Sequence, residues 1–137
     1  VQVEGPYGRF DFSDPAPQQI WVGAGIGVTP FIARMKHLAQ QGGEHNVDFF
    51  HITTEVDQAA IDKLSADAAA AGIRLHIRVS PRDGRLTPEL IRSAVPGWQQ
   101  ASIWFCGPTE FGQAIRADFV QQGLPAQRVH QELFEMR

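Results

Sequence analysis

The chain has 137 residues, of which 43% are hydrophobic, and this length and composition predict a single globular domain. A domain of this size buries roughly two thirds of the surface that its unfolded chain exposes. The net charge of -3 argues against a nucleic-acid-binding face, because such domains usually carry a clustered basic excess. No apolar run approaches the roughly 20 residues that span a bilayer. The single cysteine, Cys106, excludes an internal disulfide and a cysteine-based metal site. The five histidines do not follow helical metal-ligand spacing, so no metal site is predicted.

The first 19 residues have the pattern of a strand end, a turn and a linker. An alternating apolar start is followed by a Gly-Pro-Tyr-Gly sequence at 5–8, which indicates a strand whose partners lie upstream. The two prolines within 13–19 are typical of an interdomain linker. We therefore expect 1–19 to belong to the end of a preceding domain and its linker, and 20–137 to form the domain itself.

The stretch after this linker predicts a short apolar strand, a glycine-rich turn and the start of a helix. The turn carries Gly23, Gly25 and Gly27, and we expect Thr29 to be the N-cap and Pro30 the first helical residue. The exposed backbone amides and the positive end of the helix dipole would then face one point, which suits a diphosphate. Such a turn is a purely structural feature about as often as it binds a nucleotide, so the spacing alone leaves both interpretations open.

The remaining pattern alternates between strands and helices. After a helix ended by Gly42-Gly43, we expect a strand at 47–53, a helix at 57–71 stopped by Gly72, and a strand at 74–79. A helix capped by Thr87 and running to Val95 should follow, and then a strand at 102–106 with a turn at Gly107-Pro108. The last expected elements are a helix capped by Thr109 and ended by Gly123, and a strand at 129–133. This alternation predicts an α/β fold, a doubly wound five-stranded parallel sheet in a three-layer αβα arrangement.

With the strand order 3-2-1-4-5, the winding reverses between the first and fourth strands. Ligands of such sheets bind beyond the carboxyl ends of the strands at this reversal. The glycine-rich turn and the Cys106-Gly-Pro108 segment would therefore share one cleft.

Four segments together resemble the pyridine-nucleotide domain of the ferredoxin–NADP reductase superfamily, and most closely its ferric reductase and NADPH oxidase branch. They are Glu4-Gly-Pro-Tyr-Gly-Arg-Phe10, Val22-Gly-Ala-Gly-Ile-Gly-Val-Thr-Pro-Phe31, Cys106-Gly-Pro-Thr-Glu110 and His130-Gln-Glu-Leu-Phe134. The resemblance covers essentially the whole chain. It implies that 1–19 end a flavin-binding barrel and that 20–137 bind NAD(P)H. The cofactor-binding residues that it implies in the two strand-end segments are Gly23, Ala24, Gly25, Ile26, Gly27, Val28, Thr29, Pro30, Gly107 and Pro108.

The resemblance also implies three residues at the reacting centre. Cys106 would pack against nicotinamide and fix its distance to the flavin, Glu132 would hydrogen-bond around the nicotinamide carboxamide, and Phe134 would cover the isoalloxazine. From residue type alone, Cys106 is more often a small buried hydrophobe and Phe134 a core residue of the last strand. An activated thiolate would need a nearby base, and the sequence shows none. Residues 135–137 follow the aromatic residue that is terminal in the superfamily.

The choice between NADPH and NADH depends on the segment after the third strand. Ser80, Arg82 and Arg85 offer a hydroxyl group and two guanidinium groups to a 2′-phosphate. Pro81 displaces the arginine that NADP-dependent members have beside the serine, and Thr54 stands where the family often has another arginine. These residues favour NADPH slightly, and a solvated turn with ordinary surface arginines is the alternative.

The activity that the resemblance implies is hydride transfer from nicotinamide to FAD, followed by electron transfer to haem and ferric iron. FAD would be bound mainly by an upstream domain, and haem by a transmembrane domain of the same protein. The full-length protein would then lie at the cytoplasmic face of the inner or plasma membrane, with this piece soluble and inactive alone. The alternatives are a soluble ferredoxin or oxygenase reductase domain and a non-catalytic dinucleotide-sensing module.

Overall fold

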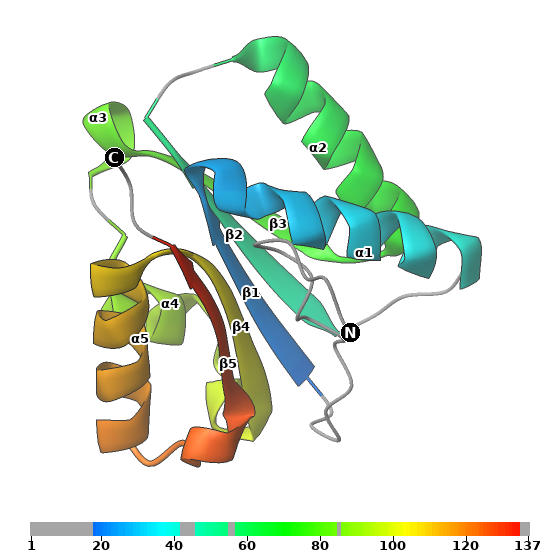
Figure 1. Ribbon diagram of the computed structural model, residues 1–137. Coiled ribbons are helices and arrows are strands. Elements are labelled where there is room, and N and C mark those ends of the chain that lie inside the picture. Colours follow the sequence, from blue (N-terminus) through cyan, green and yellow to red (C-terminus); the bar gives the residue numbers. More distant parts are fainter. Residues whose placement is uncertain (1–17, 42–45, 55–56, 85, 135–137) are drawn as a thin grey trace, which may run out of the picture.

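Five strands form one parallel sheet in the order β3-β2-β1-β4-β5 (Figure 1), which confirms the predicted α/β architecture. The computed structural model describes residues 18–41, 46–54, 57–84 and 86–134. The strands are β1 (Gln18–Ala24), β2 (Val47–Thr53), β3 (Arg74–Val79), β4 (Ala101–Pro108) and β5 (Val129–Phe134).

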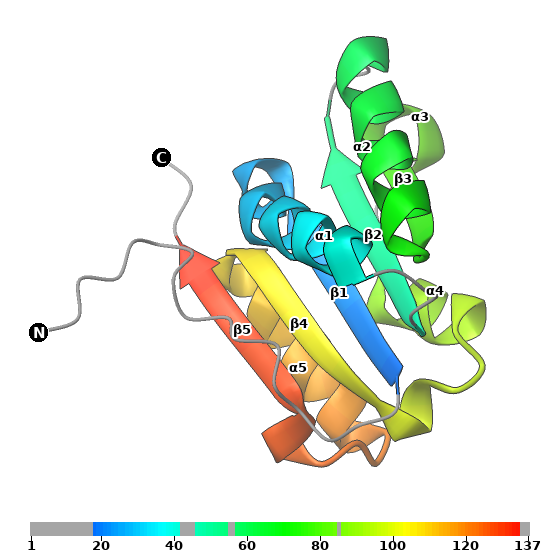
Figure 2. The same ribbon diagram turned by 90° about the vertical axis from the view of Figure 1, so that its right-hand side faces the viewer.

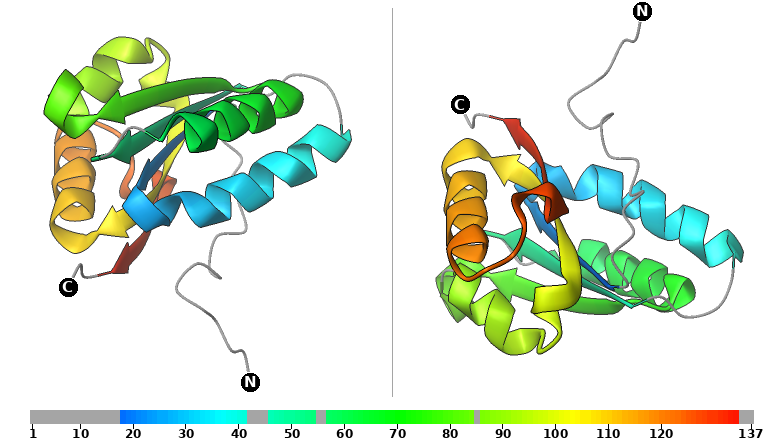
Figure 3. Two further views of the ribbon diagram at one scale, coloured as in Figure 1. Left: turned by 90° about the horizontal axis from the view of Figure 1, so that it is seen from above. Right: turned by 90° about the horizontal axis from the view of Figure 1, so that it is seen from below.

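Helices cover both faces of the sheet, as the predicted three-layer arrangement requires. They are α1 (Thr29–Gln41), α2 (Gln58–Ala71), α3 (Ser80–Asp83), α4 (Pro88–Ala94) and α5 (Thr109–Gln121), with 3₁₀ turns η1 (Gly25–Val28), η2 (Trp98–Gln100) and η3 (Ala126–Arg128). Helices α1 and α2 pack on one face, and α4 and α5 pack on the other (Figures 2 and 3). Within the described residues, no helix has the length and apolar character needed to cross a bilayer.

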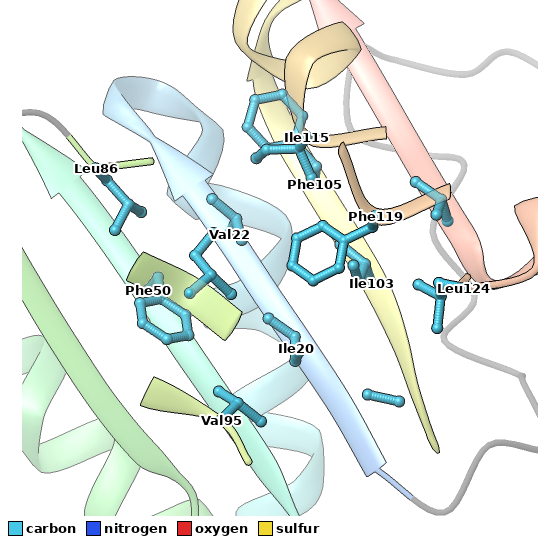
Figure 4. Packing of buried hydrophobic residues seen from close by; sticks show 13 residues of the cluster. Ile20, Val22, Phe50, Leu86, Val95, Ile103, Phe105, Ile115, Phe119 and Leu124 are labelled. Carbon is cyan, nitrogen blue, oxygen red and sulfur yellow. The ribbon is translucent and has the colours of Figure 1, made fainter. Parts of the chain in front are cut away.

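The hydrophobic core lies in two clusters because successive strand residues point to opposite faces of the sheet. On the side of α1 and α2, Trp21 stacks on Phe31 with ring centroids 5.4 Å apart, and Trp104 belongs to the same cluster. On the side of α4 and α5, strand side chains such as Val22 and Phe105 pack with helix residues (Figure 4). The apolar runs in β1 and β4 are therefore continuous because both of their faces are buried.

Capping residues set several helix ends at, or within one residue of, the positions that the sequence predicts. Asp57 precedes α2, and its carboxylate accepts a hydrogen bond from the Ala60 backbone N–H at 3.2 Å. Gly72 follows the same helix in the left-handed conformation, with φ 70°. The Thr87 hydroxyl accepts from the Leu90 backbone N–H at 3.2 Å and so begins α4.

The end of β4 corrects one prediction. Gly107 and Pro108 do not form a turn but extend the strand, because they pair in register with Leu133 and Phe134 of β5. The prediction that Thr109 caps the next helix is also wrong by one position. Pro108 occupies the N-cap, without a side-chain hydrogen bond, and Thr109 is the first residue of α5.

The glycine-rich turn also begins later than expected. Gly23 is still part of β1, because it pairs with His51 on one side and with Cys106 on the other. The chain then makes one 3₁₀ turn, η1, before α1 begins at Thr29, which is therefore a helical residue rather than the expected N-cap. The predicted stop of this helix at Gly42-Gly43 lies outside the described residues.

The segment after β3 forms a short helix, α3, where the sequence predicts no helix. The Asp83 carboxylate accepts a hydrogen bond from the Val79 backbone N–H at 2.9 Å. Arg78 donates to the backbone carbonyls of Asp83 and Gly84, at 2.6 Å and 3.0 Å. These local bonds fold the chain back over the end of β3.

Candidate functional site

The carboxyl ends of β1, β4 and β5 bring three of the predicted site residues into one row. Gly23 pairs with Cys106, and Cys106 pairs with Glu132. Two positions further along the strands, Pro108 pairs with Phe134. The reversal of winding falls between β1 and β4, so this row lies where ligands of doubly wound sheets bind.

A cavity of about 250 Å³ lies at the same strand ends. It brings together three residues that the sequence indicated, Ala24 of β1, Ser80 at the start of α3 and Pro108 of β4. The other described residues that line it are Ile52, Leu86, Glu110 and Phe111. Of the described lining residues, only Glu110 carries a charge.

In the turn η1, the backbone of Gly25 is accessible. Gly25 has φ +59°, and a Cβ added to it would meet nothing within 4 Å. A left-handed conformation beside open space favours glycine and leaves the backbone accessible. Ile26 and Gly27 follow in η1, and the Ile26 side chain lies outside the described part of the structure. At the start of α1, Thr29 is exposed and Pro30 is buried.

Val28 does not join this cavity. It lines a separate cavity of about 160 Å³ on the α1 and α2 side, together with His51 and residues of both helices. The structure therefore divides the predicted glycine-rich segment, with Ala24 at the strand-end cavity and Val28 beneath the helical layer.

Gly107 has a packing reason to be glycine. A Cβ at this position would lie 2.8 Å from Phe105 Cζ and 3.0 Å from the Ala24 Cβ. Its missing side chain lets the ends of β4 and β1 approach each other closely. Its identity alone is therefore no evidence of a ligand.

Cys106 is fully buried in the core cluster on the α1 side. A buried thiol is shielded from solvent and from reagents, which argues against an activated nucleophile. Its place beside Gly23 instead suits a side chain that supports the row from within the sheet.

These features fit a bound dinucleotide. Accessible backbone at Gly25 suits a diphosphate next to the start of α1, and the cavity of about 250 Å³ beside Ser80 has room for part of an elongated ligand. Within the described residues, no group of three or more His, Cys, Asp or Glu side chains is arranged to hold a metal ion.

No family model matches the chain. A NADPH oxidoreductase of Mycobacterium tuberculosis is 34% identical over 138 residues, which cover 98% of this chain and 36% of the relative. The toluate 1,2-dioxygenase electron transfer component of Pseudomonas putida is 27% identical over 142 residues, which cover 98% of this chain and 42% of the relative. The chain thus spans about two fifths of the length of these curated relatives.

Solved structures share the fold. A flavohaemoglobin of Malassezia yamatoensis with bound FAD and haem matches with a TM-score of 0.71 and 26% identity, over 89% of this chain and 33% of that chain. A ferredoxin–NADP⁺ reductase of Plasmodium falciparum, solved with a 2′-phosphorylated adenosine nucleotide, matches with a TM-score of 0.67 and 14% identity, over 87% of this chain and 52% of that chain. These similarities support the resemblance of the chain to the ferredoxin–NADP reductase superfamily.

Several residues that the superfamily resemblance singles out lie beyond what the structure describes. Ser80 is half-buried at the strand-end cavity, but the Arg82 side chain and all of Arg85 fall outside the described part. The backbones of Glu132 and Phe134 are placed in β5, whereas their side chains are not described.

Sequence reasoning missed some residues at or near the strand-end cavity. Phe111 lines the cavity and packs edge-on against Phe105, with ring centroids 5.4 Å apart, whereas the sequence indicated only a helix-core residue. His51 pairs with Gly23 across β2 and β1, and it lines the separate cavity beside Val28. Burial lowers the pKa of His51 below its usual value, and the neighbouring Gly23 backbone opposes this shift. The sequence signal that could have identified His51 is the alignment of the second predicted strand with the first, which places His51 opposite Gly23.

Proposed function

We propose that this chain is the NAD(P)H-binding domain of a flavin-dependent oxidoreductase, and that it presents nicotinamide for hydride transfer to FAD. The observation that carries this proposal is the row of Gly23, Cys106 and Glu132 beside the strand-end cavity. The name of the Mycobacterium tuberculosis relative, NADPH oxidoreductase, supports the same class of reaction. The bound cofactors supply the redox chemistry, and the chain binds and orients them.

Each part of the site has a separate proposed role. The amides of η1 and of the start of α1 bind the diphosphate. Cys106 packs beneath the nicotinamide, Glu132 hydrogen-bonds to its carboxamide, and Phe134 covers the flavin ring until nicotinamide replaces it.

The 2′-phosphate of NADPH is the proposed ligand of Ser80, Arg82 and Arg85. Ser80 supports this proposal because it lies at the strand-end cavity. Guanidinium groups bind phosphate with two parallel hydrogen bonds, so the two arginines would favour NADPH over NADH.

FAD is proposed to be held mainly by an upstream domain, of which residues 1–19 are the end and the linker, while 20–137 form the nucleotide domain. In a ferric reductase-like protein, electrons pass from FAD to haem in a transmembrane domain and then to ferric iron, at the cytoplasmic face of the inner or plasma membrane. A soluble ferredoxin or oxygenase reductase is the second candidate. The Pseudomonas putida relative, an electron transfer component of a dioxygenase, favours it.

Anaerobic reduction of the flavin tests the proposal. The protein joined to its native upstream flavin domain should lose its flavin absorbance when NADPH or NADH is added. Nucleotide binding without bleaching by either would contradict hydride transfer and leave the non-catalytic dinucleotide-sensing module. With bleaching established, reoxidation by a ferric chelate rather than by ferredoxin would favour the ferric reductase-like acceptor.

A further inference from the structure

Arg78 of β3 is bonded to the backbone of the short segment that follows the strand. Its Nη2 donates a hydrogen bond to the Asp83 carbonyl at 2.6 Å, and its Nε donates to the Gly84 carbonyl at 3.0 Å. Nε and one terminal nitrogen lie along one edge of the planar guanidinium group, so Arg78 binds two successive carbonyls as a rigid fork. A side chain within the strand therefore fixes the backbone five and six residues further along the chain.

The same segment is also closed by bonds of its own. The Asp83 carboxylate accepts a hydrogen bond from the Val79 backbone N–H at 2.9 Å, and the Gly84 N–H donates to the Ser80 carbonyl at 3.0 Å. Gly84 has φ +83°, a conformation that favours glycine. These bonds use the carboxylate of Asp83 and the amide of Gly84, whereas Arg78 binds their carbonyls. Ser80 thus begins a turn that is held from both sides.

The position of this turn connects it to the strand-end cavity. Ser80 lines that cavity, and Leu86, which is only 4% exposed, lines it too. Leu86 also lines a larger cavity of about 460 Å³, to which Arg78 contributes together with other residues of β3 and α4. The segment from Ser80 to Leu86 therefore starts and ends at the wall of the strand-end cavity, and Arg78 holds it in between.

The charge of Arg78 has no acidic partner in the described part of the chain. There, Arg78 bonds to the two carbonyls and to no carboxylate, whereas Arg74 and Arg92 pair with Asp48 and Asp118. Carbonyl groups carry only partial charges, so the positive charge of Arg78 also favours an anion nearby. A test of Arg78 must therefore separate its hydrogen bonds from its charge.

We infer that Arg78 is a positioning residue for recognition of the 2′-phosphate, and that its two hydrogen bonds hold the turn after β3 in the conformation that binds this group. The inference rests on the proposed function, since it assumes that Ser80, Arg82 and Arg85 bind the 2′-phosphate of NADPH. It assigns to Arg78 no contact with the ligand. NADH has no 2′-phosphate, so loss of the two bonds should affect NADPH selectively.

Three variants separate the hydrogen bonds from the charge. Arg78→Met removes both, and Arg78→Lys keeps the charge on a single nitrogen that cannot reproduce the fork. Arg74→Met is the matched control, because Arg74 lies on the same strand but binds Asp48 and lines no described part of either cavity.

The expected losses of affinity differ between the ligands. Arg78→Met should weaken NADPH and adenosine 2′-phosphate by about tenfold, and Arg78→Lys should weaken them by about fivefold. The affinity for NADH should stay within about twofold of wild type in both variants. Arg74→Met should leave all three affinities within about twofold of wild type.

Calorimetric titration with the three ligands gives these affinities, and circular dichroism verifies folding. A merely structural role for Arg78 would weaken NADPH and NADH alike or weaken neither, and either result would overturn the inference. Wild-type affinity for NADPH in Arg78→Lys would also overturn it, because the charge alone would then suffice. If Arg78→Met does not fold, Arg78→Lys decides alone.

The wild-type protein separates this inference from the proposed function. Equal affinities of the wild type for NADPH and NADH would overturn the inference, because the turn would then not recognise the 2′-phosphate. Failure of the wild type to bind either dinucleotide would instead refute the proposed function.

Discussion

Gly23 of β1 and Cys106 of β4 are cross-strand partners at the carboxyl ends of their strands. The pairing places the single thiol next to the start of the glycine-rich turn, although more than 80 residues separate the two in sequence. Parallel strands joined by crossover helices produce this juxtaposition wherever two strands flank the reversal of winding. If the proposed function is right, a change at Cys106 should alter the reaction more than the binding.

Cys106→Ala should slow anaerobic flavin reduction by about tenfold in the protein with its flavin domain, because about 1.4 kcal/mol of orientation is lost. The affinity for NADPH should change little, since the diphosphate binds elsewhere. Stopped-flow absorbance gives the rate, and its dependence on NADPH concentration gives the affinity.

Ile115→Val is the matched control for Cys106→Ala. It removes one carbon from a fully buried side chain in the cluster on the opposite face of the sheet. Both variants should lose roughly 1 kcal/mol of the free energy of unfolding. Equal rates of flavin reduction in the two variants would show that Cys106 is only a core residue.

Gly107→Ala should destabilise the fold by about 1–3 kcal/mol, because the new Cβ would overlap Phe105 and Ala24. Urea unfolding measures the loss. Gly25→Ala is the comparison, with a left-handed φ but open space around the Cβ. It should cost only about 1 kcal/mol of backbone strain. A smaller loss for Gly107→Ala than for Gly25→Ala would contradict the close packing of β4 against β1.

Arg85→Ala should weaken NADPH by about tenfold and leave NADH nearly unchanged, since only NADPH has a 2′-phosphate. Arg92→Ala is a suitable control, because Arg92 pairs with Asp118 at 2.9 Å between α4 and α5 and lines no described part of the strand-end cavity. Titration with each dinucleotide gives the ratio of affinities. Equal losses for NADPH and NADH would exclude Arg85 as the residue that recognises the 2′-phosphate.

The order of elements and the sheet topology could be predicted from the sequence because local patterns encode them. Apolar runs at β1, β2 and β4 indicate strands buried on both faces, and Thr87 and Gly72 mark helix ends by their own side-chain and backbone chemistry. The alternation of these elements then implies the crossover connections and the position of the switch point.

The features that the sequence did not predict depend on neighbours that are distant in sequence. Gly107 continues β4 because β5 offers a pairing partner, and its glycine is needed because Ala24 and Phe105 lie close. Nothing local distinguishes this glycine from one that opens a turn. The contact of His51 with Gly23 was missed for the same reason, since it follows from the register between two strands.

Asp48 is a buried carboxylate at the start of β2, well away from the strand-end site, and it pairs with the more exposed Arg74 and His76. Arg74 donates to its two carboxylate oxygens at 2.9 Å and 2.8 Å, and His76 Nε2 lies 2.9 Å from Oδ1. Burial opposes ionisation of Asp48, but the hydrogen bonds of His76 and Arg74 and the charge of Arg74 outweigh it. They lower the pKa of the carboxyl group from 3.8 to about 2.

This depressed pKa predicts a loss of stability in acid. Between pH 3.8 and 2 the unfolded chain binds the proton more readily than the folded one, so the contribution of Asp48 is complete above pH 3.8 and disappears towards pH 2. It amounts to about 2 kcal/mol. Urea unfolding across this range should show a decline in wild type that Asp48→Asn lacks and that Arg74→Met reduces but keeps. The lowered pKa of His51 also makes stability depend on pH, but this dependence begins nearer neutral pH. It is common to all three proteins, so it cancels when their pH profiles are compared. Parallel pH profiles for wild type and Asp48→Asn would show that the cluster does not stabilise the ionised carboxylate.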